Sequence, residues 1–159
     1  MGDCCCPDSD TPYGAMCPVT GTPGKRVERG TVKALLVETS LRRLSDTRHF
    51  FCAEPDCDVV YFDDAGAVYR IADLRVPVWQ KQPVGARMVC YCFGENESDM
   101  RTEIEATGDS RAVQRVREHI GAGRCACEIR NPHGVCCLGD VTAAVERVRR
   151  AAREGASKR

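Results

Sequence analysis

Cysteine content constrains this chain more than any other feature of its sequence. Twelve of the 159 residues are cysteine. Most of them stand close together: CCC near the start, C-x4-C further on, and two C-x-C motifs and a CC in the second half. Leu, Ile, Val and Phe make up only about a fifth of the chain, near the level at which a hydrophobic core becomes hard to build. Small domains with poor cores are usually stabilised by disulfides or metal ions.

The cellular compartment decides between disulfides and metals. The first residues show neither the basic start nor the apolar run of a signal peptide, and no segment approaches the ~20 apolar residues that cross a bilayer. We therefore expect a cytoplasmic protein without membrane insertion, in which closely spaced cysteines are metal ligands. The 23 basic and 23 acidic side chains cancel, so charge predicts no nucleic-acid partner.

Residues 1–16 are polar and rich in turn-forming residues, which predicts a disordered tail carrying Cys4, Cys5 and Cys6. Three adjacent thiols on a flexible segment suit a soft ion such as Cu(I) or Hg(II). The alternative is a tail without a specific role.

A zinc-binding β domain is expected over residues 17–85. Cys17 opens a Cys-Pro turn followed by glycines, as in zinc knuckles. Cys52 and Cys57 flank AEPD between the β-rich runs RHFF and DVVYF. The sequence DDAG predicts a hairpin turn after the second run, and VPVW predicts a last strand before the boundary near residue 85. A zinc ribbon is the economical interpretation, although Cys52 and Cys57 could instead be ordinary buried thiols.

The fourth zinc ligand is not evident from local spacing. A zinc knuckle would have a second cysteine three residues after Cys17, where this chain has Thr20, which is not a normal zinc ligand. We take Cys125 as the predicted fourth ligand. Cys136, His49 and a cysteine of the tail are the alternatives.

Residues 86–159 are predicted to form a helical domain around a second set of thiols. Cys90 and Cys92 lie on one side of an extended segment, because side chains alternate along it. Three helices are expected in SDMRTEIEATG, DSRAVQRVREHIGAG and DVTAAVERVRRAARE. Ser98 is the expected N-cap of the first and Gly108 its stop, and the terminal GASKR should fray.

The late cysteines RCACEIRNPHGVCC lie near expected helix N-termini, where backbone N–H groups stabilise the negative charge of sulfur. Together with the C-x-C motif they can supply four thiolates to one site. Four thiolates suit both an iron–sulfur cluster and zinc, and spacing alone leaves this choice open.

These motifs together resemble a known family. VCYCFG, the two helices and CACEIRNPHGVCCLGD are similar to the Bfd-like 2Fe–2S domain in the N-terminal half of CopZ copper chaperones, and CPVTGTPGKRV with FCAEPDCDVVYF and LRVPV is similar to the zinc-binding domain that precedes it there. The resemblance implies one zinc ion and one 2Fe–2S cluster. It assigns Cys17, Cys52 and Cys57 to zinc. For the cluster it assigns Cys90, Cys92, Cys127 and Cys137, with Cys136 or Cys125 able to exchange roles.

The expected fold class is therefore α+β, a small zinc-ribbon-like β domain followed by a helical Bfd-like 2Fe–2S domain. The resemblance implies a redox protein that supplies an electron to reduce Cu(II) to Cu(I) in copper or other soft-metal trafficking, with transient copper binding. The family's copper-transfer domain is not expected after Asp140. Delivery to a metal-transport ATPase would then use a separate copper-transfer protein or the tail thiols.

Two other interpretations remain open. A Bfd-like ferredoxin could dock to a larger redox partner through the arginines of the last helix, which could also simply be a solvated face (Arg147, Arg149, Arg150 and Arg153). A purely structural double-zinc module is the other. A catalytic site is not predicted, because the histidines are scattered and have no paired Ser or carboxylate at a catalytic spacing (His49, His119 and His133).

Overall fold

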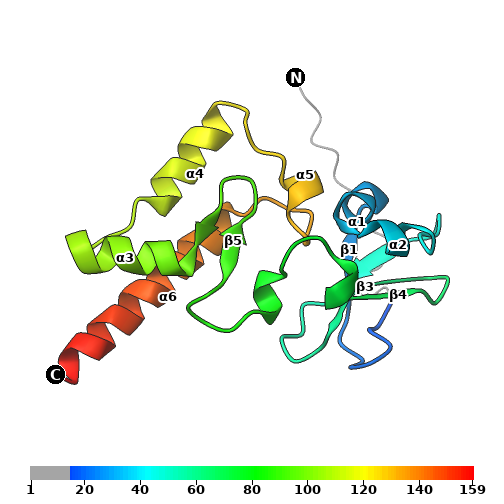
Figure 1. Cartoon of the computed structure of the whole chain (residues 1–159), viewed down its shortest axis with the longest axis horizontal. Coiled ribbons are helices and arrows are strands. Elements are labelled where there is room, and N and C mark those ends of the chain that lie inside the picture. Colours follow the sequence, from blue (N-terminus) through cyan, green and yellow to red (C-terminus); the bar gives the residue numbers. More distant parts are fainter. Residues whose placement is uncertain (1–14) are drawn as a thin grey trace.

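Residues 15–159 are described by the computed structural model of the chain, which places a β-rich half at one end of the molecule and a helical half at the other (Figure 1). The predicted metal-trapping cysteines Cys4, Cys5 and Cys6 lie outside the described residues. Within the described part, no helix is both long and apolar enough to cross a bilayer.

The β-rich half is an antiparallel sheet in the order β1-β2-β3-β4. Its strands are β1 (Lys25–Val27), β2 (His49–Phe51), β3 (Val59–Asp63) and β4 (Val68–Arg70). Every residue of β2 and β3 is buried, because both faces of the sheet are covered.

The predicted hairpin between β3 and β4 is confirmed. The Asp63 carboxylate accepts hydrogen bonds from the backbone N–H groups of Ala65 (3.0 Å) and Ala67 (2.8 Å), which fixes the turn.

The two faces of the sheet bury different residues, since successive side chains point in opposite directions. On one face Phe51, Tyr61 and Tyr69 form a core with Val32 of α1 (Arg29–Leu35); the short α2 (Glu38–Leu41) follows. On the other face Phe50 and the neighbouring apolar residues pack around thiols (Cys17, Cys52, Cys57, Val59 and Phe62).

The strand predicted at VPVW does not form. Two short 3-10 turns lie on either side of it instead: η1 (Ile71–Asp73) precedes the segment, and η2 (Trp79–Lys81) begins at its last residue. Pro77 has no N–H to donate, and the backbone N–H of Trp79 donates to the Tyr91 hydroxyl at 2.9 Å. The backbone groups that a strand would pair are therefore missing or used elsewhere.

The helical half contains the short pair β5 (Met88–Cys90) and β6 (Glu95–Asn96) and the helices α3 (Glu97–Thr107), α4 (Ala112–Gly121), α5 (Cys127–Arg130) and α6 (Leu138–Ser157). Helix α6 packs against both α3 and α4. Its inward stripe agrees with the predicted periodicity and completes a separate core (Val89, Met100, Ile104, Val116, Val141, Val145 and Val148).

Two predicted helix ends differ from the structure. Asn96, rather than Ser98, is the N-cap of α3, and its side-chain oxygen accepts from the N–H of Asp99 at 2.9 Å. Gly108 ends α3 as predicted, with a left-handed φ of 87°. The segment expected to fray at the C-terminus is helical up to Ser157.

The two halves are packed against each other through residues 128–134. The Tyr61 hydroxyl donates to the Pro132 carbonyl at 2.6 Å, and the His133 ring stacks on Phe51 with 5.1 Å between ring centroids. Thr31 of α1 donates to the Glu128 carbonyl. The fold is thus a mixed α and β architecture with an antiparallel sheet, and the boundary near residue 85 stays a prediction.

A second group of contacts surrounds Trp79. The guanidinium groups of Arg87 and Arg147 lie over its ring, at 5.7 Å and 5.8 Å from the ring centroid. Arg147 also pairs at 3.0 Å with the buried carboxylate of Glu97, whose other oxygen accepts from the N–H of Gly85 at 2.6 Å. These contacts hold the connection between the halves against α3 and α6.

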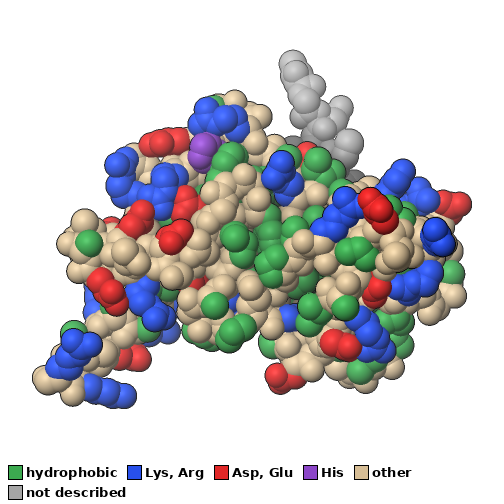
Figure 2. Space-filling model, in the orientation of Figure 1, with side chains coloured by type: hydrophobic (Ala, Val, Ile, Leu, Met, Phe, Trp, Pro, Cys, Tyr) green, Lys and Arg blue, Asp and Glu red, His purple; other side chains and the backbone are tan. Residues whose placement is uncertain are grey.

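The surface carries both signs of charge in a mixed pattern. Figure 2 shows Lys and Arg side chains interspersed with Asp and Glu over both halves, with apolar side chains gathered between the halves. The distribution agrees with the formal net charge of zero.

Candidate metal centres

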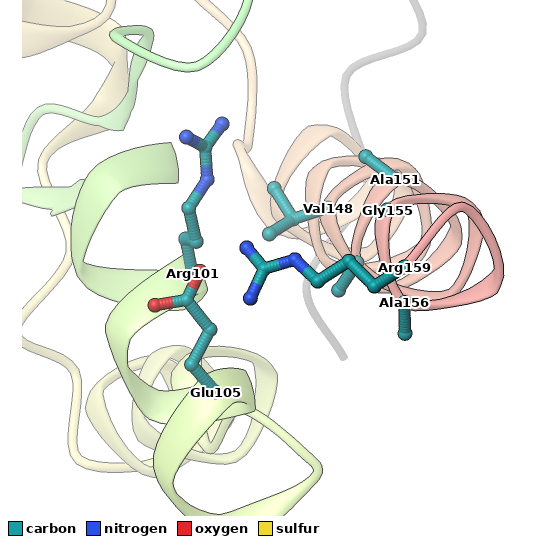
Figure 3. Close-up of a pocket in the computed structure, with 8 residues that line it drawn as sticks. Arg101, Glu105, Val148, Ala151, Gly155, Ala156 and Arg159 are labelled. Atoms are coloured by element: carbon teal, nitrogen blue, oxygen red, sulfur yellow. The ribbon is translucent and has the colours of Figure 1, made fainter.

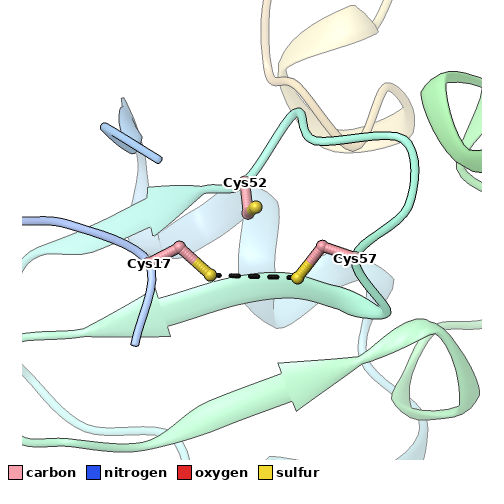
Figure 4. Close-up of side chains that lie close together, drawn as sticks. All are labelled: Cys17, Cys52 and Cys57. Carbon is pink, nitrogen blue, oxygen red and sulfur yellow. Dashed lines mark hydrogen bonds between the residues drawn. The ribbon is translucent and has the colours of Figure 1, made fainter. Parts of the chain in front are cut away.

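Three buried thiols converge on one face of the sheet (Figure 4). Cys17 lies in a turn before β1, which is closed by hydrogen bonds from the Cys17 N–H to Thr22 O and from the Gly21 N–H to Cys17 O, both 2.8 Å. Cys52 directly follows β2, and Cys57 ends a turn in which its N–H donates to the Glu54 carbonyl at 3.2 Å. We call Cys17, Cys52 and Cys57 the first thiol set.

The geometry of the first thiol set fits a zinc ion. Its three sulfurs all lie within 4.8 Å of one another, and those of Cys17 and Cys57 are 3.9 Å apart. Tetrahedral zinc with Zn–S bonds of about 2.3 Å places its sulfur ligands about 3.8 Å apart. All nine described cysteines are free thiols. The thiols therefore stand where zinc ligands would, without a disulfide among them.

Hydrogen bonding prepares Cys17 to be a thiolate. Burial raises the pKa of its thiol, but hydrogen bonds from the Thr20 hydroxyl and from the N–H groups of Thr20 and Val19 outweigh burial and lower the pKa to about 7. Burial raises the pKa of Cys52 to about 11. Metal binding would displace the thiol protons of both residues, because cysteine binds metal ions as the deprotonated thiolate.

Lys81 supplies a positive charge beside the first thiol set. Its ammonium donates to the backbone carbonyls of Glu54 at 2.7 Å and Cys57 at 2.8 Å. Its charge acts to lower the pKa of Cys52 against the larger effect of burial.

The structure does not bring the predicted fourth ligand, Cys125, or one of its alternatives, His49, to this set. His49 belongs to the opposite face of the sheet, with its Nε2 3.8 Å from Asp63 and its ring 6.4 Å from that of Tyr69. Cys125 does not belong to the group of three sulfurs that lie within 4.8 Å of one another. The thiols whose charges act on Cys125 are instead those of Cys127, Cys136 and Cys90.

A second group of four thiols forms where three elements of the helical half meet. Cys90 ends β5, Cys92 follows in the next turn, Cys127 begins α5 and Cys137 precedes α6. The sulfurs of Cys92 and Cys127 are 3.8 Å apart, and the Cys137 thiol interacts with those of Cys127 and Cys90. We call these four the second thiol set.

Burial separates the two adjacent cysteines before α6. The Cys137 side chain is 1% exposed and belongs to the helical core, whereas Cys136 is exposed. The structure therefore brings the predicted residue of this pair, Cys137, to the second thiol set.

Backbone N–H groups surround the second thiol set. The N–H of Ala126 donates to the sulfur of Cys92 at 3.3 Å. Hydrogen bonding with Cys137, partly offset by burial, lowers the pKa of Cys127 to about 6 and that of Cys90 to about 7. Burial raises the pKa of Cys92 to about 11. The set thus holds negative charge on sulfur in a partly dry environment.

Comparison with known proteins decides the character of the first thiol set. Residues 14–75 match the family zf_CopZ, described as "Zinc binding domain". This part of the chain is a CopZ-type zinc-binding domain. The chain is also similar to the copper chaperone CopZ of Archaeoglobus fulgidus, with 34% identity over 122 residues that cover 76% of this chain. It spans 57% of the length of that curated relative.

The solved structure of the N-terminal domain of Archaeoglobus fulgidus CopZ is also similar. It superposes with a TM-score of 0.65 at 31% identity, over 81% of this chain and 96% of that domain. The structural likeness extends into the helical half, because the match covers 81% of this chain whereas the zinc-binding domain spans only residues 14–75.

Sequence reasoning missed an aromatic stack that begins at the residue after Cys92. Phe93, next to Cys92, stacks on His119 with 3.6 Å between ring centroids and 8° between planes. Arg124 donates to Nδ1 of His119 at 2.8 Å. No sequence signal links this histidine to a phenylalanine 26 positions earlier.

A groove between α3 and the end of α6 lies apart from both thiol sets (Figure 3). It has a volume of about 690 Å³, and Arg101, Glu105 and Arg159 line it with small residues of α6. It contains no thiol and takes no part in the proposals below.

Proposed function

We propose that this protein handles copper, or another soft metal, with one zinc ion held by the first thiol set and one 2Fe–2S cluster held by Cys90, Cys92, Cys127 and Cys137. The observation that carries the proposal is the convergence of four thiols from distant segments, joined by the 3.8 Å contact of the Cys92 and Cys127 sulfurs. The helical core does not need these thiols for packing, because valines and Met100 already fill it.

The spacing within the second thiol set favours a binuclear cluster over one zinc ion. A single tetrahedral zinc needs all its sulfur ligands about 3.8 Å apart. Among the described residues, the first thiol set is the one group of three or more donors that all lie within 4.8 Å of one another. The second set is more widely spread, as two bridged irons require.

The chain's own residues suit an anionic cluster. The Ala126 N–H donates to Cys92, and further N–H groups, of Phe93 and Cys92, donate to Cys90. Hydrogen bonds to sulfur stabilise cluster charge and tune the reduction potential. Phe93, which stacks on His119, packs against the core that contains three of these thiols.

When bound, a 2Fe–2S cluster supplies one electron, which suffices to reduce Cu(II) to Cu(I), the form that thiolates hold. A one-electron donor of the cytoplasm restores the reduced cluster. The printed name of the Archaeoglobus relative, a copper chaperone, favours copper over mercury as cargo. A separate copper-transfer protein or a metal-transport ATPase is then the expected recipient.

The test is anaerobic purification followed by metal analysis and copper titration. We expect one zinc, two irons and two acid-labile sulfides per chain, and a brown protein whose reduced cluster is oxidised by one equivalent of Cu(II). Cys137→Ser should abolish the cluster absorption, whereas the matched change Cys136→Ser should retain it. A colourless protein with two zinc ions would contradict the proposal and support a structural double-zinc module.

A second candidate function is that of a ferredoxin docking to a larger redox partner. Ile129 and Val135, each 49% exposed, lie close in sequence to the thiols Cys127 and Cys137. Exposed apolar side chains of this kind are often buried in interfaces.

The arginines of α6 are less suited to this docking than the sequence indicated. Arg147 pairs with Glu97, and Arg149 pairs with Asp109 and Glu146. The pair of changes Ile129→Asp and Val135→Asp should slow electron transfer from a protein donor and leave the direct reaction with Cu(II) unchanged. Equal rates with a protein donor would exclude docking at this surface.

A further inference from the structure

Tyr91 stands between two of the proposed cluster ligands, Cys90 and Cys92, and its side chain reaches the connection between the two halves. Its hydroxyl donates to the Pro77 carbonyl at 2.7 Å and accepts from the Trp79 N–H at 2.9 Å. Burial raises the pKa of this phenol, so the hydroxyl keeps its proton at neutral pH and can make both bonds at once. One side chain thus ties the C-x-C segment to the start of η2.

The other end of η2 holds the turn that carries two members of the first thiol set. Lys81 is the last residue of η2, and its ammonium donates to the carbonyls of Glu54 at 2.7 Å and Cys57 at 2.8 Å. Both carbonyls belong to the turn between Cys52 and Cys57, whose sulfurs lie together at the proposed zinc site. Since η2 is only three residues long, a movement of this turn reaches Trp79 within a single helical turn.

We propose that Tyr91 is a positioning residue for the cluster ligands and that, through η2, zinc binding at the first thiol set favours the reduced state of the cluster at the second. This inference rests on the proposed occupancy of the two thiol sets by zinc and a 2Fe–2S cluster. Zinc orders the turn that Lys81 holds, and Tyr91 passes this order from η2 to the C-x-C segment.

The backbone around Tyr91 carries the donors on which the reduction potential depends. The N–H groups of Cys92 and Phe93 donate to the Cys90 sulfur, and the Gly94 N–H donates to the Cys90 carbonyl at 2.8 Å, which closes the turn. Hydrogen bonds to sulfur stabilise the extra negative charge that one-electron reduction places on a cluster. A fixed Tyr91 keeps these donors aligned, so removal of its hydroxyl should lower the reduction potential.

Linkage between the two sites makes the inference quantitative. Couplings between sites typically change affinity by about 5- to 150-fold and act equally in both directions. We expect about tenfold here, which for a one-electron couple corresponds to about 59 mV of reduction potential. Zinc should therefore bind about tenfold more tightly when the cluster is reduced than when it is oxidised.

The experiment uses the full-length, anaerobically purified protein loaded with zinc and the cluster. A redox titration followed by cluster absorption gives the reduction potential, and chelator competition in both oxidation states gives the zinc affinity. Tyr91→Phe keeps the ring and removes the hydroxyl, so it should lower the potential by about 59 mV. It should also make the zinc affinity equal in the two oxidation states.

A second variant tests the connection through η2. Lys81→Met removes the ammonium that holds the Cys52–Cys57 turn and should change both quantities in the same direction as Tyr91→Phe. Combining Lys81→Met with Tyr91→Phe should give no larger change than Tyr91→Phe alone, because both substitutions interrupt one connection.

Matched controls separate positioning from general loosening of the fold. Tyr69→Phe removes a hydroxyl that donates to the Arg43 carbonyl at 2.8 Å within the β-rich half. Lys33→Met removes an exposed ammonium of α1. Both controls should leave the potential and the redox dependence of zinc binding unchanged.

An unchanged potential in Tyr91→Phe would overturn the inference, as would a zinc affinity of the unsubstituted protein that is the same in both oxidation states. An equal shift in Tyr69→Phe, or additive shifts in the double variant, would overturn it too. If Tyr91→Phe binds no cluster, Lys81→Met decides alone, and its unchanged potential would overturn the inference. An unsubstituted protein that binds no iron or no zinc would instead overturn the proposed function.

Discussion

The two thiol sets use similar ligands but depend on the fold in different ways. The first set is compact, with three sulfurs mutually within 4.8 Å, and it forms part of a small core of its own. The second set is spread over three elements, and three of its four thiols belong to a larger core made mostly of aliphatic side chains. We expect metal to be needed for folding at the first set, and the proposed cluster at the second set to be bound by an already folded frame.

Metal removal should show this difference between the two thiol sets most strongly. Structural zinc contributes about 10–16 kcal/mol of apparent binding free energy in zinc-dependent peptides, so removal of zinc should unfold the β-rich half. Loss of the cluster should leave α3, α4 and α6 folded, because their core contains few thiols. Circular dichroism and limited proteolysis after selective removal of each metal measure the difference. Equal loss of structure in both cases would contradict the comparison.

Adding a single methyl group at Gly24, beside the core that contains the first thiol set, should have the next largest effect on stability. A Cβ on Gly24 would lie 2.5 Å from the Phe62 ring and 2.7 Å from the Phe50 side chain. Gly24→Ala should therefore lower the free energy of unfolding by about 1–3 kcal/mol through overpacking and weaken zinc binding. The measurements are chemical denaturation and chelator competition.

Gly155→Ala is the matched control in the helical half. It lies within α6 with nothing within 4 Å of the new Cβ, so it should be neutral or slightly stabilising. Equal destabilisation by the two substitutions would show that crowding at the first set is not the cause.

The contact between the halves gives a smaller effect. Tyr61→Phe removes the hydroxyl that donates to the Pro132 carbonyl at 2.6 Å, and it should cost about 1 kcal/mol of unfolding free energy. The change should make the two halves unfold in less coincident transitions, monitored by circular dichroism and cluster absorption. An unchanged unfolding free energy would contradict this role of the hydroxyl.

Acidification should give the smallest effect. Burial lowers the pKa of His133 below its ordinary value of 6.5, so the unfolded chain binds the proton more readily than the folded one. The folded state is then favoured above pH 6.5, and stability falls as pH drops from 6.5 towards the lowered pKa, by at most about 1.4 kcal/mol per pH unit. His133→Phe, which can keep the stack on Phe51, should flatten this dependence in thermal melts. An unchanged slope would assign it to other groups.

Local chemistry made much of the fold predictable. The hairpin after β3 follows from Asp63 and the turn residues that accompany it, and the stop of α3 follows from Gly108. The buried stripe of α6 follows from valines at helical spacing. These features depend on residues a few positions apart, which is the range over which sequence patterns carry information.

Long-range packing limited the remainder. The first thiol set joins residues 40 positions apart, and the motifs and the resemblance to a family predicted its three members but left the fourth ligand open. The choice between Cys136 and Cys137 depends on burial beneath α6, and the distance of Cys125 from the first set depends on how the halves pack. The missing strand at VPVW depends on the hydroxyl of Tyr91, which sequence reasoning could not place.

Trp79 is the chain's one tryptophan, and it lies at the junction of the halves with Arg87 and Arg147 over its ring. The chain therefore carries an intrinsic fluorophore at the junction between its two halves. The fluorescence emission of Trp79 should change when the contacts at this junction are lost. Metal loading, partner docking and separation of the two halves can then be followed in real time without an added label.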